Sequence, residues 1–224
     1  MTELLNRNLF DSKGTLAEEL IASRDYPWEL LPLIGDFVAE LAERLCRMPG
    51  WKMLSPGVAA AEDAVIAESA VICGPSVIGP GTEVRPGAYI RGKVLVCGGC
   101  VVGNSTELKN AVLLNGAKLP HYTYAGDSIV GNRAHMGAGA VASNLKFNGT
   151  NVVIRNRKTG ECIETGLRKV GAFLADGADV GCHCVLNPGT VIGKNTVLYP
   201  NICFRGTAPE NSIVKSPDNI VPRN

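Results

Sequence analysis

Apolar residues return at every sixth position through most of the chain after residue 58. From Ala60 the aliphatic position repeats in steps of six as far as Leu108, and Gly, Pro and Asn collect between these positions. Ordinary strands joined by loops of variable length do not produce so regular a period, which is typical of a parallel β-helix built from hexapeptide repeats. After two contractions of one residue the pattern continues through Leu113, Leu119, Ala125, Val130, Met136 and Ala142, and it returns at Leu186, Ile192 and Leu198.

Each hexad is expected to form a short strand and a corner, with its aliphatic residue pointing to the axis. Three hexads would close a triangular coil of about 18 residues, and stacked coils would pair about 4.8 Å apart. One coil buries little by itself, so stability would come from stacking. The open ends need covers, and we expect the N-terminal helices or the C-terminal tail to supply them.

The period divides the chain into a helical segment at 1–54, a β-helix domain at 55–207 and a tail at 208–224. One helix is predicted to follow Pro27 and to end at Pro49-Gly50. We assign it a packing role, either on the β-helix or on a partner subunit. Its apolar stripe steps by three and four through Leu31, Ile34, Val38, Leu41 and Leu45.

A loop insertion at 143–169 interrupts the hexads. Asn151–Arg155 and Glu161–Thr165 flank Lys158-Thr-Gly160, a pattern that predicts a β-hairpin projecting from the prism. The basic run Arg155–Lys158 on this hairpin is either a contact for coenzyme A phosphates or a solvated hairpin tip.

Composition and charge exclude several classes of protein. Hydrophobic residues make up 46% and charged residues 19%, which excludes a largely disordered chain. A net charge of +1 argues against a nucleic-acid partner or a polybasic membrane contact. No stretch of 18 uninterrupted apolar residues is present, and the N-terminus lacks the order of a signal peptide. We therefore expect a cytoplasmic protein without a membrane partner.

Eight cysteines are then expected to be reduced thiols that fill apolar positions. Cys97-x-x-Cys100 and Cys182-His183-Cys184 are the two clusters that could suggest zinc. Structural zinc sites usually need two such pairs, separated by the spacings found in zinc-binding families. We therefore expect no bound metal.

Stacking arithmetic brings chemically useful residues together. If the hexads that start at 82, 100, 117 and 134 share a face, His121 lies between Asn104 and Ala138. The preceding column then contains Arg85, Gly103, Pro120 and Gly137, and the neighbouring face aligns Arg91, Lys109 and Gly126, with Tyr124 nearby. Arg85 and His121 would be two coils apart, roughly 10 Å. This arrangement suits a small anionic ligand lying along the prism.

His121 is the candidate general base, because an imidazole can take a proton from an attacking amine or hydroxyl near neutral pH. A lone histidine is more often structural, but polar and aromatic residues cluster around this one. In the next coil, the backbone N–H groups of Ala138 and Gly139 could hydrogen-bond a developing oxyanion. Glu107 and Asp127 could orient a substrate amine or His121; Asp127 is equally explained as a corner residue.

Four sequence motifs carry a resemblance to a known family, over residues 80–200. They are Arg85-Pro-Gly87, Gly103–Asn110, Pro120–Asp127 and His135–Gly139. In this order they resemble the left-handed β-helix acetyltransferase domain of the bifunctional N-acetylglucosamine-1-phosphate uridyltransferase/glucosamine-1-phosphate acetyltransferases. The resemblance implies the left hand of the coil and a homotrimer with acyl-CoA sites between subunits. It also implies acetyl-CoA as the donor and a place in UDP-N-acetylglucosamine biosynthesis.

The resemblance also implies roles for individual residues. His121 would be the general base, and the Ala138 amide would hold the thioester oxygen. The phosphosugar would be bound by Arg85, Lys109 and Tyr124. Asn144 would contact the acyl donor or a neighbouring subunit's substrate. In the donor site, Gly139 lies beside Ala138 and Cys182 stands where the family has Ser.

The sequence departs from the family pattern at several points. His135 replaces an Asn and is assigned either to acceptor binding or to a merely exposed position. The segment Asn144–Gly149 lacks the family's Tyr and Asp, and the hairpin replaces a following Lys. No nucleotidyltransferase domain or Gly-rich nucleotide loop is recognised in the sequence.

We therefore predict an acyl-CoA-dependent acyltransferase acting on an amino or hydroxyl group of a sugar phosphate or nucleotide sugar. The first alternative is a non-catalytic trimeric sugar-nucleotide-binding protein that kept the scaffold. The second is a carbonic-anhydrase-like metalloenzyme with His121, His135 and His183 as ligands, although their spacing does not match that family.

Overall fold

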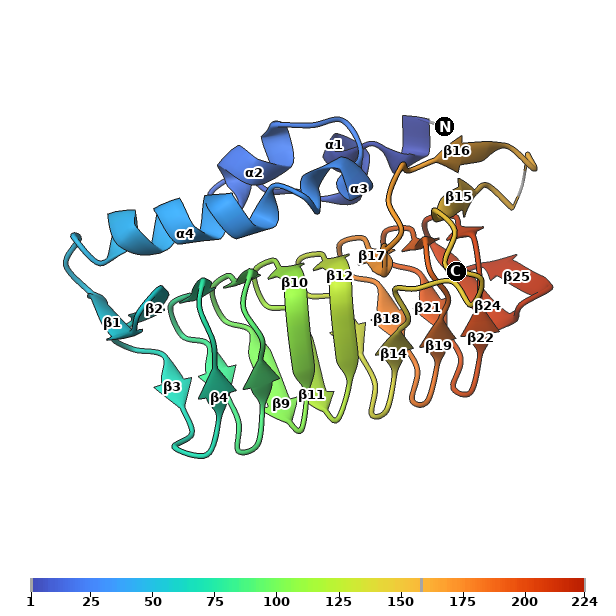
Figure 1. Ribbon diagram of the computed structural model, residues 1–224. Helices are drawn as coiled ribbons and strands as arrows, with labels where there is room; N and C mark the ends of the chain where they lie inside the picture. Colours follow the sequence, from blue (N-terminus) through green and yellow to red (C-terminus); the bar gives the residue numbers. More distant parts are fainter. Residues whose placement is uncertain (1, 158, 224) are drawn as a thin grey trace.

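The computed structural model describes residues 2–157 and 159–223. The predicted fold class is confirmed: the chain is mainly β and forms a left-handed parallel β-helix with helices at its N-terminus. Figure 1 shows the coils stacked along one axis, with the helices laid on one side of the stack. Lys158, in the predicted hairpin turn, lies outside the described residues.

Three faces form the prism, and each is a stack of parallel strands. Face 1 consists of β2 (Val58–Ala61), β5 (Ser76–Ile78), β8 (Val94–Val96), the second halves of β10 (Glu107–Leu113) and β12 (Tyr124–Val130), β17 (Ala172–Leu174), β20 (Thr190–Ile192) and β23 (Thr207–Ala208). Face 2 consists of β3 (Val65–Ile66), β6 (Glu83–Val84), β9 (Val101–Asn104), β11 (Lys118–His121), β13 (His135–Met136), β18 (Asp179–Val180), β21 (Val197–Leu198) and β24 (Ser212–Ser216). Face 3 consists of β4 (Val71–Ile72), β7 (Tyr89–Ile90), the first halves of β10 and β12, β14 (Val141–Ala142), β19 (Val185–Leu186) and β22 (Cys203–Phe204).

The six-residue period is the inward-facing ladder of this prism. Ile90, Leu108 and Ala125 follow one another in register on face 3, and all three are fully buried. The same axial cluster includes Leu174 and Val180, so the repeat resumes two hexads before Leu186, where the sequence pattern shows it again. Isoleucine, leucine and valine predominate at these positions, and their side chains fill the axis between the stacked coils.

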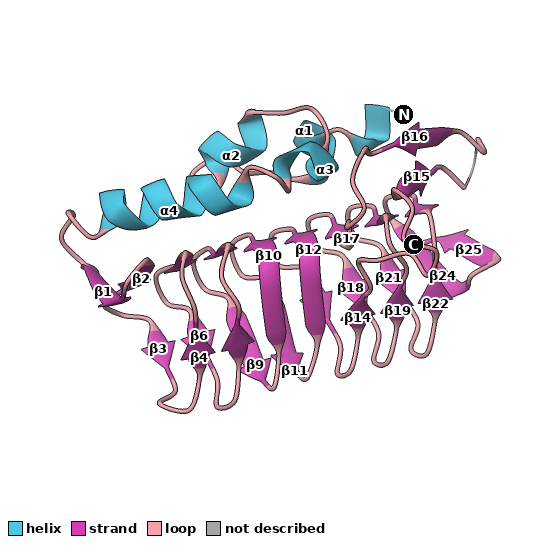
Figure 2. Ribbon diagram, viewed as in Figure 1, coloured by secondary structure: helices cyan, strands magenta, loops and turns pink. Residues whose placement is uncertain are grey.

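The N-terminal segment lies along face 1, and this corrects the expectation that it covers an end of the prism. Its helices are η1 (Thr2–Leu4), α1 (Asn6–Leu9), α2 (Glu18–Ala22), α3 (Pro27–Leu30) and α4 (Ile34–Leu45). The apolar stripe of α4 is buried against the outward residues of face 1, among them Val77 and Leu95. Figure 2 shows α4 running lengthwise beside the stack, across successive strands of this face. Face 1 is therefore apolar on both sides, as in other sheets covered on both faces.

The single helix predicted after Pro27 is two helices. α3 ends at Leu30 and α4 begins at Ile34, with Pro32 between them. Pro32 has no backbone N–H and cannot continue an α-helical hydrogen-bond ladder, so the chain turns there. Leu31 still contributes to the apolar cluster, since its side chain is only 3% exposed.

Hairpins close the two ends of the stack. β1 (Trp51–Ser55) pairs antiparallel with β2 at the first coil, and β25 (Asn219–Pro222) pairs antiparallel with β24 at the last. The stretch 208–224, expected to be a tail, thus supplies the last strands, and Ile220 packs on the axial cluster. These pairings satisfy backbone groups that an open edge would expose.

The insertion leaves the repeat as a hairpin and then packs back on the prism. β15 (Val153–Arg155) pairs antiparallel with β16 (Cys162–Glu164). Val152 and Ile154 are fully buried against the C-terminal part of face 1, so the hairpin does not extend freely into solvent. A bridge between Leu145 and Lys169 closes the neck of the insertion. No helix among the described residues is both long and apolar enough to cross a membrane.

Candidate active site

The corner between faces 2 and 3, here called the 2/3 corner, places the residues of the predicted site in consecutive coils. It comprises 85–88, 103–106, 120–123, 137–140, 181–184 and 199–202, which link the face 2 strands to the face 3 strands. His121 pairs with Asn104 in register, and its carbonyl oxygen accepts a hydrogen bond from Gly139 N at 3.2 Å. The order Asn104, His121, Ala138 predicted from the hexad spacing is therefore the order in the structure.

The backbone N–H of Ala138 is available for a ligand. Within the described ranges no acceptor is found for it, whereas the Ala138 carbonyl accepts from His183 N at 2.8 Å. Pro86 and Pro200 occupy the same column two coils before His121 and two coils after Ala138, and proline has no N–H to donate. At Pro86 and Pro200 the coils stack without an N–H at this position, so stacking does not require the Ala138 N–H, which can bind an oxyanion one coil from His121.

Gly139 has a different part in the corner from that predicted. Its N–H is already engaged by the His121 carbonyl, and its φ of +70° is readily adopted only by glycine. A Cβ at this position would lie 2.7 Å from His183 Nδ1 and 3.1 Å from Tyr122 Cε2. Gly139 therefore leaves room for these two side chains to lie over the corner.

Tyr122 and His183 are corner residues that sequence reasoning does not assign to the site. Their rings lie 6.3 Å apart between centroids, and both residues are exposed beside His121 and Ala138. The sequence signal that could have identified them is their position in the hexads, because Tyr122 directly follows His121 and His183 directly follows Cys182. Cys182, predicted in the donor site, lies in the column of Ala138 one coil further on and exposes its thiol.

Face 3 carries the predicted acceptor-binding residues. Lys109 is half-buried and pairs in register with Gly126, and Arg91 occupies the same column one coil earlier. Glu107 does not reach His121; it forms an ion pair with Arg91 at 2.6 Å. The face thus presents two cations side by side, of which Lys109 has no ion pair within the described ranges.

Tyr124 belongs to a hydrogen-bond network with Asn144, Asp127 and Asn110. Asn144 Nδ2 donates to Tyr124 Oη at 3.2 Å and to Asp127 Oδ2 at 2.6 Å, while Asn110 Nδ2 donates to Asp127 Oδ1 at 2.8 Å. Burial, followed by the charges of Asp127 and Glu107, raises the pKa of Tyr124. The phenol therefore stays protonated near neutral pH and can donate to a ligand while it accepts from Asn144.

The network also decides between the two interpretations of Asp127. Its carboxylate is 6% exposed and receives an amide hydrogen bond on each oxygen, so it holds Asn110 and Asn144 rather than a substrate amine. It is a corner residue as well, with φ of +50°. The side-chain amide nitrogen of Asn144, predicted to contact the acyl donor, is likewise turned inward to Tyr124 and Asp127.

Arg85 and His135 lie on face 2 and make contacts of their own. Arg85 forms a 3.0 Å ion pair with Glu83, two coils before the His121 coil. His135 Nδ1 lies 2.8 Å from Asp179 Oδ1. The backbone of His135 pairs in register with Lys118. The hydrogen bond from His135 is the main cause that lowers the pKa of Asp179. Neither residue contacts His121 within one chain.

The metal sites considered from the sequence are the two cysteine clusters and the three histidines. In the part of the chain that the structure describes, no three His, Cys, Asp or Glu side chains come together to hold a metal. Of the cysteine pair, Cys97 points into the cluster under the helices and Cys100 into the prism axis. Burial raises the pKa of both thiols, that of Cys100 to about 12, which keeps it protonated and apolar in character.

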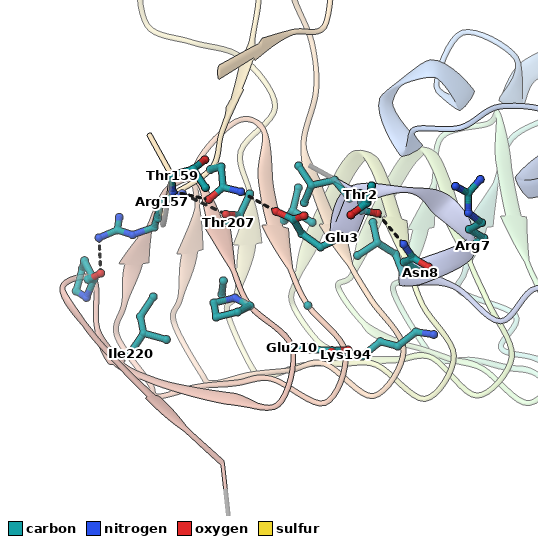
Figure 3. Close-up of a pocket in the computed structure, with 18 of the residues that line it drawn as sticks. Thr2, Glu3, Arg7, Asn8, Arg157, Thr159, Lys194, Thr207, Glu210 and Ile220 are labelled. Carbon is teal, nitrogen blue, oxygen red and sulfur yellow. Dashed lines mark hydrogen bonds between the residues drawn. The ribbon is translucent and has the colours of Figure 1, made fainter. Parts of the chain in front are cut away.

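A cavity of about 1120 Å³ lies elsewhere, at the C-terminal end of face 1. Figure 3 shows it between the first residues of the chain, the hairpin insertion and the last coils. Arg157 on its rim donates to Pro217 O at 2.6 Å and to Asp218 Oδ1 at 3.0 Å, and so ties the hairpin to the C-terminal strands. Arg157 belongs to the basic run considered as a contact for coenzyme A phosphates, but none of the residues predicted for catalysis or for acceptor binding lines this cavity. The candidate site is the open 2/3 corner and not this deeper cavity, because His121 and the free Ala138 N–H lie at the corner.

Comparison with known proteins agrees with this interpretation of the fold. A family model described as the GMPPB C-terminal domain matches residues 72–160. The bifunctional protein GlmU of Methanococcus maripaludis is 30% identical over 111 residues, which cover 50% of this chain and 26% of that protein. The bifunctional sugar-1-phosphate nucleotidylyltransferase/acetyltransferase of Sulfurisphaera tokodaii is 35% identical over 90 residues, 40% of this chain and 22% of that protein. The chain thus spans about a quarter of the length of these curated relatives.

Among solved structures, the acetyltransferase domain of PglB from Neisseria gonorrhoeae is similar at 14% identity and a TM-score of 0.41. The alignment covers 74% of this chain and 57% of that one. The β-helix of this chain is similar to the hexapeptide-repeat domains of acetyltransferases. It is similar in particular to the GlmU-like bifunctional sugar-1-phosphate enzymes, and this confirms the resemblance drawn from the sequence motifs.

Proposed function

We propose that this chain is an acyl-CoA-dependent acyltransferase that takes acetyl-CoA as donor. The acceptor is an amino or hydroxyl group of a sugar phosphate or nucleotide sugar. The observation that carries the proposal is the stacking of an exposed His121 one coil from the unengaged N–H of Ala138. A base and an oxyanion donor at neighbouring positions are the two groups that acyl transfer from a thioester needs.

In the proposed mechanism, His121 removes a proton as the acceptor attacks the thioester carbonyl carbon. The Ala138 N–H stabilises the negative charge on the oxygen of the tetrahedral intermediate. When the intermediate collapses, the carbon–sulfur bond breaks, and the proton on His121 passes to the departing coenzyme A thiolate. General base catalysis of this kind contributes typically 10²- to 10⁴-fold to a rate.

Face 3 supports the acceptor part of the proposal. The Lys109 ammonium is placed to meet a sugar phosphate, and the protonated Tyr124 phenol can donate to it or to a sugar oxygen. Arg85 lies on face 2, two coils before His121, and supplies a further cation for the acceptor. We assign His135 to acceptor binding and Gly139 and Cys182 to the donor side, where Gly139 shapes the corner.

We further propose a homotrimer, since the 2/3 corner is open and needs a second wall to exclude water. Face 1 is covered by the chain's own helices, which leaves faces 2 and 3 for contact with a partner. Tyr89 and Val185 on face 3 are exposed apolar residues at outward positions, as is Tyr199 at the 2/3 corner. A partner subunit packed on these positions would enclose His121.

The experiment that tests the proposal is acetyl transfer from acetyl-CoA to glucosamine-1-phosphate, other amino sugar phosphates and their nucleotide-linked forms. Product should be detected by its mass, because the exposed cysteines Cys73, Cys162, Cys182 and Cys203 would consume a thiol reagent. Acetylated product with at least one acceptor is the expected result. Calorimetric binding of a nucleotide sugar with no product from any acceptor would contradict it and favour the non-catalytic binding protein.

A further inference from the structure

A second cavity lies at the corner between faces 3 and 1, here called the 3/1 corner. Its volume is about 640 Å³, within the range of sites for small ligands. Three segments far apart in the sequence line it: the connection between α3 and α4, the 3/1 corner itself and the neck of the insertion. Leu31, Lys93, Asn110, Leu145, Arg168 and Lys169 are among the residues that line it.

The lining combines positive charge with apolar walls. Lys93, Arg168 and Lys169 bring three cations to the cavity, and Asp127 is its one carboxylate. That carboxylate is buried and already accepts from Asn110 and Asn144, so the cations remain the groups offered to a ligand. Leu31, Pro32, Leu145 and Leu167 supply apolar surface. An anion attached to a flat, partly apolar group matches this lining.

Two of the three cationic side chains are positioned in part by their neighbours. The aliphatic stem of Lys93 packs on Gly35 of α4, where a Cβ would lie 3.1 Å from Lys93 Cδ. Arg168 Nε donates to Gly149 O at 3.0 Å, which fixes the guanidinium over the neck and leaves its terminal nitrogens for a ligand. Lys169 is fixed at the backbone by its bridge to Leu145. Groups held before binding lose less entropy when a ligand arrives.

The cavity lies next to the proposed acceptor site. Asn110, which lines it, directly follows Lys109 along β10. Asp127, which also lines it, binds the Asn144 amide that reaches Tyr124. Consider a ligand that binds Lys109 through its phosphate and points its sugar toward His121. A group attached to the other side of that phosphate would lie in this cavity.

We propose that the cavity at the 3/1 corner binds the nucleoside diphosphate part of a nucleotide-linked sugar, so that the acceptor is a nucleotide sugar rather than a sugar 1-phosphate. This inference rests on the proposed function and narrows its substrate class. Lys93, Arg168 and Lys169 bind the phosphates, and the apolar walls bind the nucleoside. The 1120 Å³ cavity at the far end of face 1 contains basic residues as well, but it adjoins no residue of the proposed acceptor site.

The test is calorimetric binding of UDP, dTDP, GDP and CDP to the full chain, with acetyl-CoA and adenosine 3′,5′-bisphosphate as separate probes. The variants are Lys93→Ala and Arg168→Ala, since both side chains are exposed and their loss leaves the core intact. Lys194→Ala is the matched control, because it removes one cation from the other cavity. We expect at least one nucleoside diphosphate to bind, and each cavity variant to weaken it roughly tenfold.

The outcomes separate this inference from the proposed function. Nucleotide binding that falls in the two cavity variants and not in Lys194→Ala supports the inference. Loss of acetyl-CoA or adenosine 3′,5′-bisphosphate binding in the same variants would overturn it, because the cavity would then hold the donor. If no nucleoside diphosphate binds while sugar 1-phosphates are acetylated, the proposed function stands and the inference is wrong. Binding of nucleoside diphosphates without acetylation of any acceptor would leave the cavity assignment in place and contradict the enzyme.

Discussion

Asn144 donates from Nδ2 to Asp127 Oδ2 at 2.6 Å, which ties the neck of the insertion to the 3/1 corner beside Lys109. The same amide nitrogen reaches Tyr124 Oη, so one buried carboxylate holds Asn144 and, through it, orients Tyr124 of the proposed acceptor site. A contact of this kind stabilises the fold and positions the site at once.

The Asp127→Ala variant is expected to lower the free energy of unfolding by about 1–3 kcal/mol, since two partly buried amides lose their acceptor. The same variant should raise KM for the acceptor more than it changes kcat, because Tyr124 and Asn144 would no longer be held. Urea denaturation and steady-state kinetics measure the two effects. An Asp127→Ala protein with unchanged stability and unchanged KM would contradict the positioning role.

Gly139→Ala is expected to reduce acetyl transfer strongly while the chain still folds. The added Cβ would meet His183 Nδ1 at 2.7 Å and would displace the side chains over the corner. Gly99→Ala is the matched control: Gly99 also has positive φ, +65°, but a Cβ there meets nothing within 4 Å. Both variants should lose about 1–2 kcal/mol of stability through backbone strain. Equal loss of activity in both would show that strain alone, and not the corner, is responsible.

Leu119→Ala removes a fully buried side chain from the axial ladder, two residues before His121. The coils above and below hold Val102 and Met136 and cannot collapse fully into the space. The expected loss is about 2–5 kcal/mol in the free energy of unfolding. Val65→Ala, at a side chain 67% exposed, should change it little. Similar small effects for both variants, measured by chemical denaturation, would contradict the axial packing.

The His135–Asp179 hydrogen bond predicts a pH dependence of stability. Because the folded pKa of Asp179 is lowered, its contribution is fully present above the ordinary carboxyl pKa of about 3.9 and is lost as pH falls through the folded value. Asp179→Asn should therefore destabilise the chain at about pH 5 and converge with wild type in stronger acid. Asp63→Asn, at an exposed carboxylate on the first coils, is the control. A difference between wild type and Asp179→Asn that does not change with pH would contradict the hydrogen bond.

The sequence predicts the prism well because its period fixes register directly. Each hexad adds one strand, so counting by six is enough to place His121 against Asn104, and Lys118 against His135. The restart of the repeat at Leu174 escapes the pattern, because the insertion at 143–169 interrupts the count of six. Phe173 faces the helices, a contact that the hexad period does not encode.

Long-range packing does not follow from the sequence pattern. An amphipathic helix shows which of its faces is apolar, but not which surface will cover that face, so face 1 cannot be identified as the surface under α4. The 3/1 cavity likewise needs Leu31, Lys93 and Arg168 brought together by that packing. The sequence predicts only part of the Asp127 network. It indicates that Asp127 is a corner residue, but it does not indicate that Asn110 and Asn144 donate to its carboxylate.

The central claim is that His121 is the general base of an acetyl transfer, and one comparison tests it most directly. Single-turnover acetylation of the best acceptor is measured for wild type and for His121→Ala, with and without added imidazole. A general base at this position predicts a loss of roughly 10²-fold or more in the variant, with part of the rate restored by imidazole and acetyl-CoA binding unchanged. A His121→Ala protein that acetylates at the wild-type rate would contradict it.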